Sequence, residues 1–281
     1  MKLVRYGQAG IEKPGLIDAA GKIRDLSKVV PDLSGDYLSP QSLAKIARIK
    51  PASLPQVRGR RRLGACVGKP GNFIAVGLNY ADHAAESGHP IPSEPVLFNK
   101  APTCIVGPND DVVIPKGAEK LDWEVELGVV IGQRASYVAE RNALDHVAGY
   151  CLANDVSERN FQLERGGNWM KGKSAPTFGP LGPWLVTPDE IPNVQRLALW
   201  LDVNGKRMQN GTTRTMIFGV RKLVSYVSHF ITLHAGDVIA TGTPPGVGSG
   251  VKPEPIFLKV GDTMKLSVEG LGVQTQRVVE A

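Results

Sequence analysis

Short apolar segments of strand length, separated by glycine and proline, follow one another through most of this chain. Only one stretch, 219–231, has the continuous apolar face of a long amphipathic helix. This pattern predicts a β-dominated α+β domain whose sheet forms a sandwich or a roll. The Asn204-Gly205 pair predicts a two-residue hairpin. The expected strands are 72–76, 96–98, 111–114, 123–131, 147–154, 197–203, 238–241, 263–269 and 273–279.

The first 65 residues differ from the rest and are expected to form a small N-terminal α+β domain. Three short strands are predicted at 2–5, 15–18 and 22–25, and a short helix begins after Ser39, with Ser39 as its N-cap and Pro40 in its first turn. Prolines and arginines between 51 and 62 predict a linker. The chain of 281 residues is long enough for this unit and a larger domain over 70–281.

Composition limits the partners. The net charge is +6, but the excess is local to Arg58, Arg60, Arg61 and Arg62, and no aromatic residues are interleaved with it, so no nucleic-acid partner is expected. A mildly positive field would attract a small anionic substrate. No uncharged apolar run approaches the roughly 20 residues of a membrane span. The three cysteines lie far apart, which favours a reducing compartment, the cytoplasm.

Two glutamates stand in an apolar strand pattern. Glu124 and Glu126 would point to the same face, because side chains alternate along a strand. Asp155 directly follows another apolar strand. Three buried carboxylates repel one another and lose their hydration, and a hard divalent cation such as Mg²⁺ or Mn²⁺ removes both costs. The alternatives are a strand with one wetted face for the glutamates and a helix N-cap for Asp155.

A second candidate group is His83 and Glu86, which are neighbours on a helix because they are three residues apart. A carboxylate that orients a histidine forms a general base for water. The alternative is an exposed ion pair of little energetic worth.

Further polar residues could bind an anion. Arg159 and Gln162 would share a helical face, and with Lys173 they could bind a carboxylate or stabilise an oxyanion. Alternatively, they belong to a solvated helix and a basic loop. The segment around Thr243 is rich in glycine but lacks the Gly-Lys-Ser/Thr of a phosphate loop. It predicts a rigid turn that is either structural or offers hydroxyl and N–H groups to a carboxylate.

Taken in order, these motifs resemble those of the fumarylacetoacetate hydrolase family over roughly residues 70–280. The resemblance implies a mixed β-sandwich roll, a homodimer and a site for Mg²⁺ or Mn²⁺. One departure is that some members carry a further aspartate shortly before the histidine, where this chain has 74–77 without a carboxylate. The matching motifs are Gly77-x-Asn79-Tyr80-x-x-His83-x-x-Glu86, Asp122-x-Glu124-x-Glu126-Leu127, Asn154-Asp155-x-Ser157-x-Arg159-x-x-Gln162, Lys173-Ser174 and Thr241-Gly242-Thr243-Pro244-x-Gly246-Val247-Gly248.

The resemblance also implies a role for each matching residue. It implies Glu124, Glu126 and Asp155 as metal ligands, and His83, Glu86 and Lys173 as catalytic residues. It implies Tyr80, Arg159, Gln162 and Thr243 as substrate-binding residues.

The implied activity is metal-dependent cleavage of a C–C bond in a 2,4-dioxo acid, either an acylpyruvate or a 2,4-dioxo-3-deoxy sugar acid, with release of pyruvate and a carboxylic acid. The same site could serve an oxaloacetate-type decarboxylase, a ureidoglycolate lyase or a dienedioate isomerase, because one fold hosts several reactions. A binding protein stabilised by a metal is the non-enzymatic alternative. The His83 and Glu86 pair and Lys173 argue against it, since a structural metal site needs neither.

Overall fold

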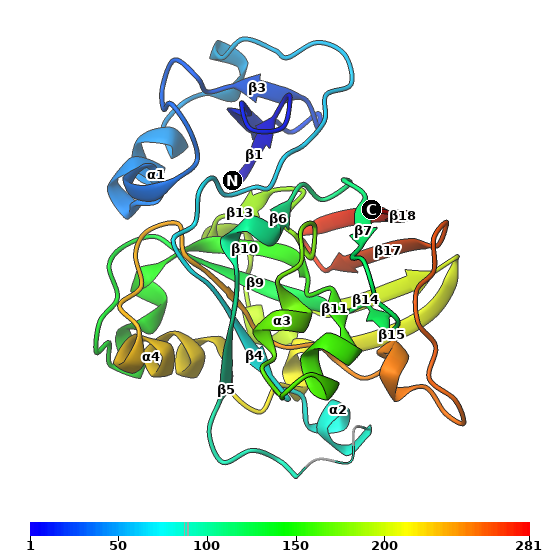
Figure 1. Ribbon diagram of the computed structural model, residues 1–281. Helices are drawn as coiled ribbons and strands as arrows, with labels where there is room; N and C mark the ends of the chain where they lie inside the picture. The colour runs from blue at the N-terminus through cyan, green and yellow to red at the C-terminus, as the bar shows by residue number, and fades with distance from the viewer. Residues whose placement is uncertain (87, 89) are drawn as a thin grey trace.

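The computed structural model describes residues 1–86, 88 and 90–281, and strands dominate it (Figure 1). The largest sheet has the order β3-β2-β1-β13-β10-β9-β16-β4-β5, and a second sheet has the order β15-β14-β17-β18-β7. Two small sheets pair β11 with β8 and β12 with β6. The strands are β1 (Lys2–Tyr6), β2 (Lys13–Ile17), β3 (Ile23–Asp25), β4 (Phe73–Gly77), β5 (Val96–Lys100), β6 (Ile105–Val106), β7 (Val112–Ile114), β8 (Leu121–Asp122), β9 (Val125–Ile131), β10 (Val147–Asn154), β11 (Ser157–Glu158), β12 (Gly179–Pro180), β13 (Leu185–Val186), β14 (Ala198–Val203), β15 (Lys206–Thr212), β16 (Val238–Ala240), β17 (Thr263–Val268) and β18 (Gly272–Glu280).

Helices are fewer and mostly short. The longest, α4 (Val220–Phe230), buries the apolar face that its sequence predicted. The helix α1 (Pro40–Ala47) begins as expected, because the Ser39 side chain accepts a hydrogen bond from the Ser42 N–H. The other helical segments are α2 (Ala81–Glu86), α3 (Met170–Lys173), a π-helical turn (Asn160–Glu164) and 3₁₀ turns at Gly35–Leu38, Pro51–Ser53, Pro102–Cys104, Glu140–His146, Pro188–Glu190, Val194–Arg196, Thr213–Thr215 and Gly248–Gly250.

The core lies between the two larger sheets. Every residue of β9 and β10 is buried, as their continuous apolar runs predict for central strands. Buried and exposed residues alternate in β17 and along most of β18, which have one face on the core and one in solvent. The strand β9 contacts β14 and β17 of the second sheet. The predicted β-dominated α+β fold is confirmed.

The first 65 residues continue the largest sheet. Strand β1 pairs antiparallel with β13 through Lys2↔Val186 and Leu3↔Leu185, and β2 and β3 follow outward. Figure 1 shows this unit at one end of the molecule, above β13. These strands extend the sheet at one edge, and the division into domains at 65–70 stays a prediction.

Two local expectations were wrong. The strand expected over 123–131 begins at Val125, so Glu124 precedes it. The helix expected after Asp155 is instead the short strand β11 followed by the π-helical turn. The reason is tertiary, because Ser157 and Glu158 pair with β8 through Asp122 and Leu121.

None of the described helices is long and apolar enough to cross a membrane.

Candidate active site

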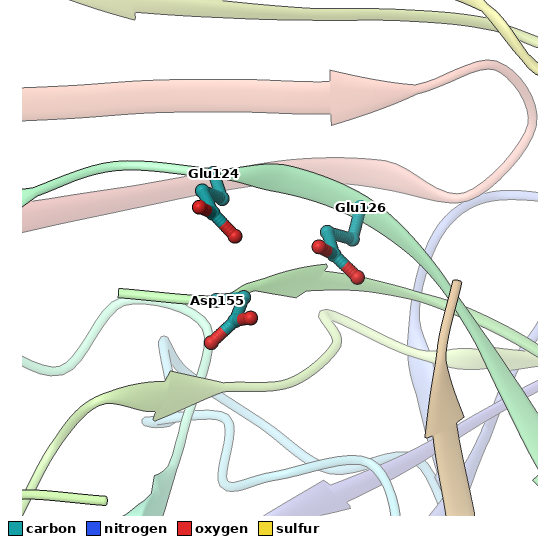
Figure 2. A group of neighbouring side chains, drawn as sticks. All are labelled: Glu124, Glu126 and Asp155. Atoms are coloured by element: carbon teal, nitrogen blue, oxygen red, sulfur yellow. The ribbon is translucent and has the colours of Figure 1, made fainter. Parts of the chain in front are cut away.

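Strand register brings the three predicted metal ligands together. Antiparallel pairing sets Val125 opposite Asn154, and the Asp155 N–H donates to the Glu124 carbonyl (2.9 Å). Residues directly opposite each other point to the same face of a sheet, so Glu124, Glu126 and Asp155 converge (Figure 2). One carboxylate oxygen from each lies within 4.8 Å of the others, and all three residues are buried.

The remaining parts of the site arrive at the same edge of the sheet. Strands β4 and β16 are parallel, and β9 runs antiparallel to β16, so β4 and β16 end where β9 begins. Asn79 lies in the loop after β4, and its Nδ2 donates to the carbonyl of Thr241, directly after β16 (2.8 Å), and to the carbonyl of Phe218, just before α4 (3.0 Å). This side chain therefore joins the loop after β4 to the loop after β16. Helix α2 follows β4, and the 241–250 loop follows β16. These short elements place the histidine pair beside the carboxylates.

Basic side chains hold two of the three carboxylates. Arg159 Nη2 donates to Glu124 Oε1 (2.7 Å), and Lys173 Nζ donates to Glu124 Oε2 and Asp155 Oδ2 (2.8 Å each). Lys100 Nζ donates to the other Asp155 oxygen, Oδ1 (2.6 Å). Glu126 instead accepts a neutral hydrogen bond, from the Gly242 N–H to Oε2 (2.8 Å).

This arrangement leaves one carboxylate without a counter-charge. Burial raises the pKa of Glu126 well above 4.5, and the negative charges of Asp155 and Glu124 raise it further. Burial alone would also raise the pKa of Glu124, but the charges of Lys173 and Arg159 lower it to about 2. The cluster joins four carboxylates, Asp122, Glu124, Glu126 and Asp155, to three bases, Lys100, Arg159 and Lys173.

The histidine pair forms as predicted. His83 Nδ1 lies 3.1 Å from Glu86 Oε2, and His83 is only 7% exposed, so the pair is not a surface ion pair. The Gly246 N–H donates to both Glu86 oxygens (3.0 and 3.1 Å). Burial would raise the pKa of Glu86, but the hydrogen bonds from His83 and Gly246 lower it. The lowered pKa keeps the Glu86 carboxylate ionised. This carboxylate contacts Nδ1 of the imidazole, so Nε2 is the ring nitrogen left for another partner.

One cavity of about 260 Å³ is lined by two carboxylates of the cluster, two of its bases and the His83 and Glu86 pair. Its polar lining includes His83, Glu86, Glu124, Glu126, Arg159, Gln162, Lys173 and Thr243, and its apolar lining includes Phe98, Leu163 and Trp169.

The predicted substrate-binding residues differ in how many of their polar groups already bond to other protein groups. The Thr243 hydroxyl donates to the Val125 carbonyl (2.9 Å) and accepts from Gln209 Nε2 (2.8 Å), so it already has two structural partners. Gln162 accepts from Arg159 Nη1 (3.0 Å), as expected of residues that share a face. Tyr80 is fully buried outside the lining of this cavity, and its contact with substrate stays a prediction.

Sequence reasoning missed Asp122 and Lys100. Asp122 accepts hydrogen bonds from the Gly248 N–H (2.6 Å), the Ser249 N–H (3.0 Å) and Arg159 Nε (2.8 Å), so it ties the 241–250 loop to the cluster. Asp122 stands two residues before Glu124 in the same motif, and this spacing of two is the sequence signal that could have identified it. Lys100 ends an ordinary apolar strand, and no local pattern marks it.

The donor set suits a hard divalent cation. Three carboxylates converge, the cluster has one more carboxylate than it has bases, and carboxylate oxygens are the preferred ligands of Mg²⁺ and Mn²⁺. The residues present therefore fit the metal that the resemblance implies.

Comparison with known proteins finds similarity along the whole chain. The model of the fumarylacetoacetate (FAA) hydrolase C-terminal domain matches residues 72–279. A Burkholderia cenocepacia protein, named provisionally as a hydrolase, is 63% identical over 281 residues, which cover both chains completely. The structure of fumarylacetoacetate hydrolase from the psychrophile Exiguobacterium antarcticum has a TM-score of 0.85 and 36% identity, with both chains covered completely.

An isomerase is also similar. The 5-carboxymethyl-2-hydroxymuconate delta-isomerase of Mycobacterium smegmatis has a TM-score of 0.76 and 33% identity, over 100% of this chain and 99% of that chain. The family resemblance drawn from the motifs is thus confirmed, and the family model covers residues 72–279. The chain belongs to the fumarylacetoacetate hydrolase family.

Proposed function

We propose that this protein is a divalent-metal-dependent hydrolase that cleaves a C–C bond of a 2,4-dioxo acid, an acylpyruvate or a 2,4-dioxo-3-deoxy sugar acid, to pyruvate and a carboxylic acid. One observation carries the proposal: the His83 and Glu86 pair lines the same cavity as Glu124 and Glu126 of the carboxylate cluster. Such a cavity combines a base for water with a site for a cation, as hydrolysis of a chelating oxo acid requires.

Glu124, Glu126 and Asp155 would hold Mg²⁺ or Mn²⁺. Bound there, the ion would supply Lewis acidity toward the carboxylate and 2-oxo oxygens of the substrate. The raised pKa of Glu126 supports this assignment, because ionising this buried carboxylate is costly without a counter-charge, and a bound cation would supply one.

His83 would act on water. Glu86 holds Nδ1, so Nε2 can accept the proton of a water molecule in the cavity. The resulting hydroxide would attack the 4-oxo carbon. Lys173 has three N–H donors, of which two bond to Glu124 and Asp155, so the third can stabilise the oxyanion.

The second half of the reaction breaks the C3–C4 bond. Its electron pair passes to C3 as the enolate of pyruvate, and the C4 carbonyl re-forms as the carboxylic acid. The proton that His83 took from water is returned to C3. One water is consumed, and pyruvate and one acid are released.

Isomerisation of a dienedioate is a second candidate, because the Mycobacterium smegmatis relative is named as an isomerase. The same imidazole would then move a proton between two carbons without water attack. As to assembly and partners, we propose a cytoplasmic homodimer that acts on a small anionic oxo acid.

The test is pyruvate release by metal-stripped protein before and after addition of Mg²⁺ or Mn²⁺, with an acylpyruvate, a 2,4-dioxo-3-deoxy sugar acid and oxaloacetate as substrates. Metal-dependent pyruvate formation from a 2,4-dioxo acid, lost in His83→Ala, is expected. If oxaloacetate is the only one of the three substrates that yields pyruvate, the protein is a decarboxylase. A change in the ultraviolet spectrum of a dienedioate without pyruvate would identify an isomerase.

A further inference from the structure

One buried base of the cluster takes no part in the proposed chemistry. Lys100 is the last residue of the edge strand β5, it is 1% exposed, and it does not line the cavity. Its ammonium group uses three N–H donors, which bond to Asp155 Oδ1 (2.6 Å), the Val156 carbonyl (3.3 Å) and the Lys173 carbonyl. An ammonium has three N–H groups, so Lys100 has no donor left for a substrate.

These bonds close a ring of contacts around Asp155. Lys100 Nζ donates to Oδ1, and Lys100 does not line the cavity. Lys173 lines the cavity, and its Nζ donates to Oδ2 (2.8 Å). Lys100 also holds the main chain of Lys173, whose side chain reaches the cavity. One buried side chain therefore restrains both a carboxylate of the cluster and the backbone that carries Lys173.

We infer that Lys100 is a positioning residue that orients Asp155 for cation binding and fixes the end of α3. The inference rests on the proposed metal site. Burial removes the hydration of the Lys100 ammonium, which costs free energy. The Phe73 ring lies 5.9 Å from Nζ (to its centroid) and offsets only a small part of this cost, so the three hydrogen bonds must offset the rest. Mutating a partner that orients a metal ligand in this way typically costs about 10–100-fold in metal affinity or activity.

Charge alone predicts the opposite effect. A cation beside the cluster repels a divalent ion, so removing Lys100 would strengthen metal binding if only its charge mattered. If orientation dominates, removing it weakens binding. The sign of the change separates the two explanations.

The experiment is titration calorimetry of Mn²⁺ into metal-stripped wild type and Lys100→Met. We expect Lys100→Met to bind Mn²⁺ roughly 10–100-fold more weakly. Lys100→Gln keeps N–H donors without the charge, and it should recover part of the affinity and serve if Lys100→Met does not fold. Unchanged or tighter binding in these variants would overturn the inference.

Two further measurements separate positioning from general destabilisation. Asp237 is a matched control, because it is also buried and accepts three hydrogen bonds, from the Asn72 N–H, Asn72 Nδ2 and the His234 N–H, at the opposite ends of β4 and β16. Asp237→Asn should destabilise the protein without weakening Mn²⁺ binding. In an Asp155→Asn background, Lys100→Met should weaken Mn²⁺ binding by a smaller factor than it does in the wild type, because part of its effect passes through Asp155.

The two proposals fail differently. If the wild type binds no Mn²⁺, both the proposed metal site and this inference are overturned. If the wild type binds Mn²⁺ and the Lys100 variants match it, only the role of Lys100 is overturned. Additive losses in the double variant would show that Lys100 acts independently of Asp155, against the inference.

Discussion

Replacing Glu126 by glutamine should stabilise the metal-free protein and weaken its cation binding. Glu126 is the carboxylate of the cluster without a basic partner, and its pKa is raised well above 4.5 by burial, Asp155 and Glu124. Glutamine has nearly the same shape, and its oxygen can still accept the Gly242 N–H. The substitution therefore removes the charge while keeping the packing.

The size of the effect follows from proton linkage. Above pH 4.5 the unfolded chain releases the Glu126 proton, while the folded protein retains it until its raised pKa is reached. The stability of the metal-free wild type therefore falls by about 1.4 kcal/mol per pH unit across that window from this group alone. Glutamine does not titrate, so the advantage of Glu126→Gln over the wild type should start near zero below pH 4.5 and grow with that slope.

Urea unfolding in EDTA at several pH values between 4 and 8 measures this difference. Addition of Mn²⁺ at about 100 times its Kd should stabilise the wild type by about 2.7 kcal/mol and Glu126→Gln by much less. Glu158→Gln is the control, because Glu158 accepts the main-chain N–H groups of Glu119, Lys120 and Phe161 and should lose stability instead. Parallel pH profiles for the wild type and Glu126→Gln would refute the reasoning.

Three other changes have defined outcomes. His83→Ala should lower turnover by about 10²- to 10⁴-fold and leave Mn²⁺ affinity unchanged, measured by pyruvate release and calorimetry, since a general base is lost and no ligand is; weaker Mn²⁺ binding would contradict this. Arg159→Met should cost about 3–5 kcal/mol in urea unfolding, because Asp122 and Glu124 lose a buried partner; a stability within 1 kcal/mol of wild type would contradict the importance of this pair. Ser39→Ala should cost about 1 kcal/mol by the same assay, through the lost cap of α1, and leave turnover unchanged.

The sequence predicted the central strands well and the short ones poorly. The strand over 147–154 is observed with the same bounds, because its apolar run is long and uninterrupted. The two-residue strands β6, β8, β11, β12 and β13 were not predicted. They exist because neighbouring segments are held side by side, and two residues carry no periodic pattern that a sequence could reveal.

The candidate site was predicted as separate motifs, and their convergence is a result of the fold. The spacing of Glu124 and Glu126 and the spacing of His83 and Glu86 are local, so periodicity alone placed each pair on one face. Lys100 could not be assigned to the site from local spacing, because its partners Asp155 and Lys173 lie 55 and 73 residues away in the chain.

By itself, the sequence determined the β-dominated class, the central strands, the cap of α1 and the family, because these depend on residue types at short spacing. Only the tertiary structure decided which carboxylates are neutralised and which one is left over. That outcome depends on antiparallel register between β9 and β10 and on basic side chains delivered by β5, α3 and the segment after β11. Charge pairing between distant segments acts through space, so no local pattern records it.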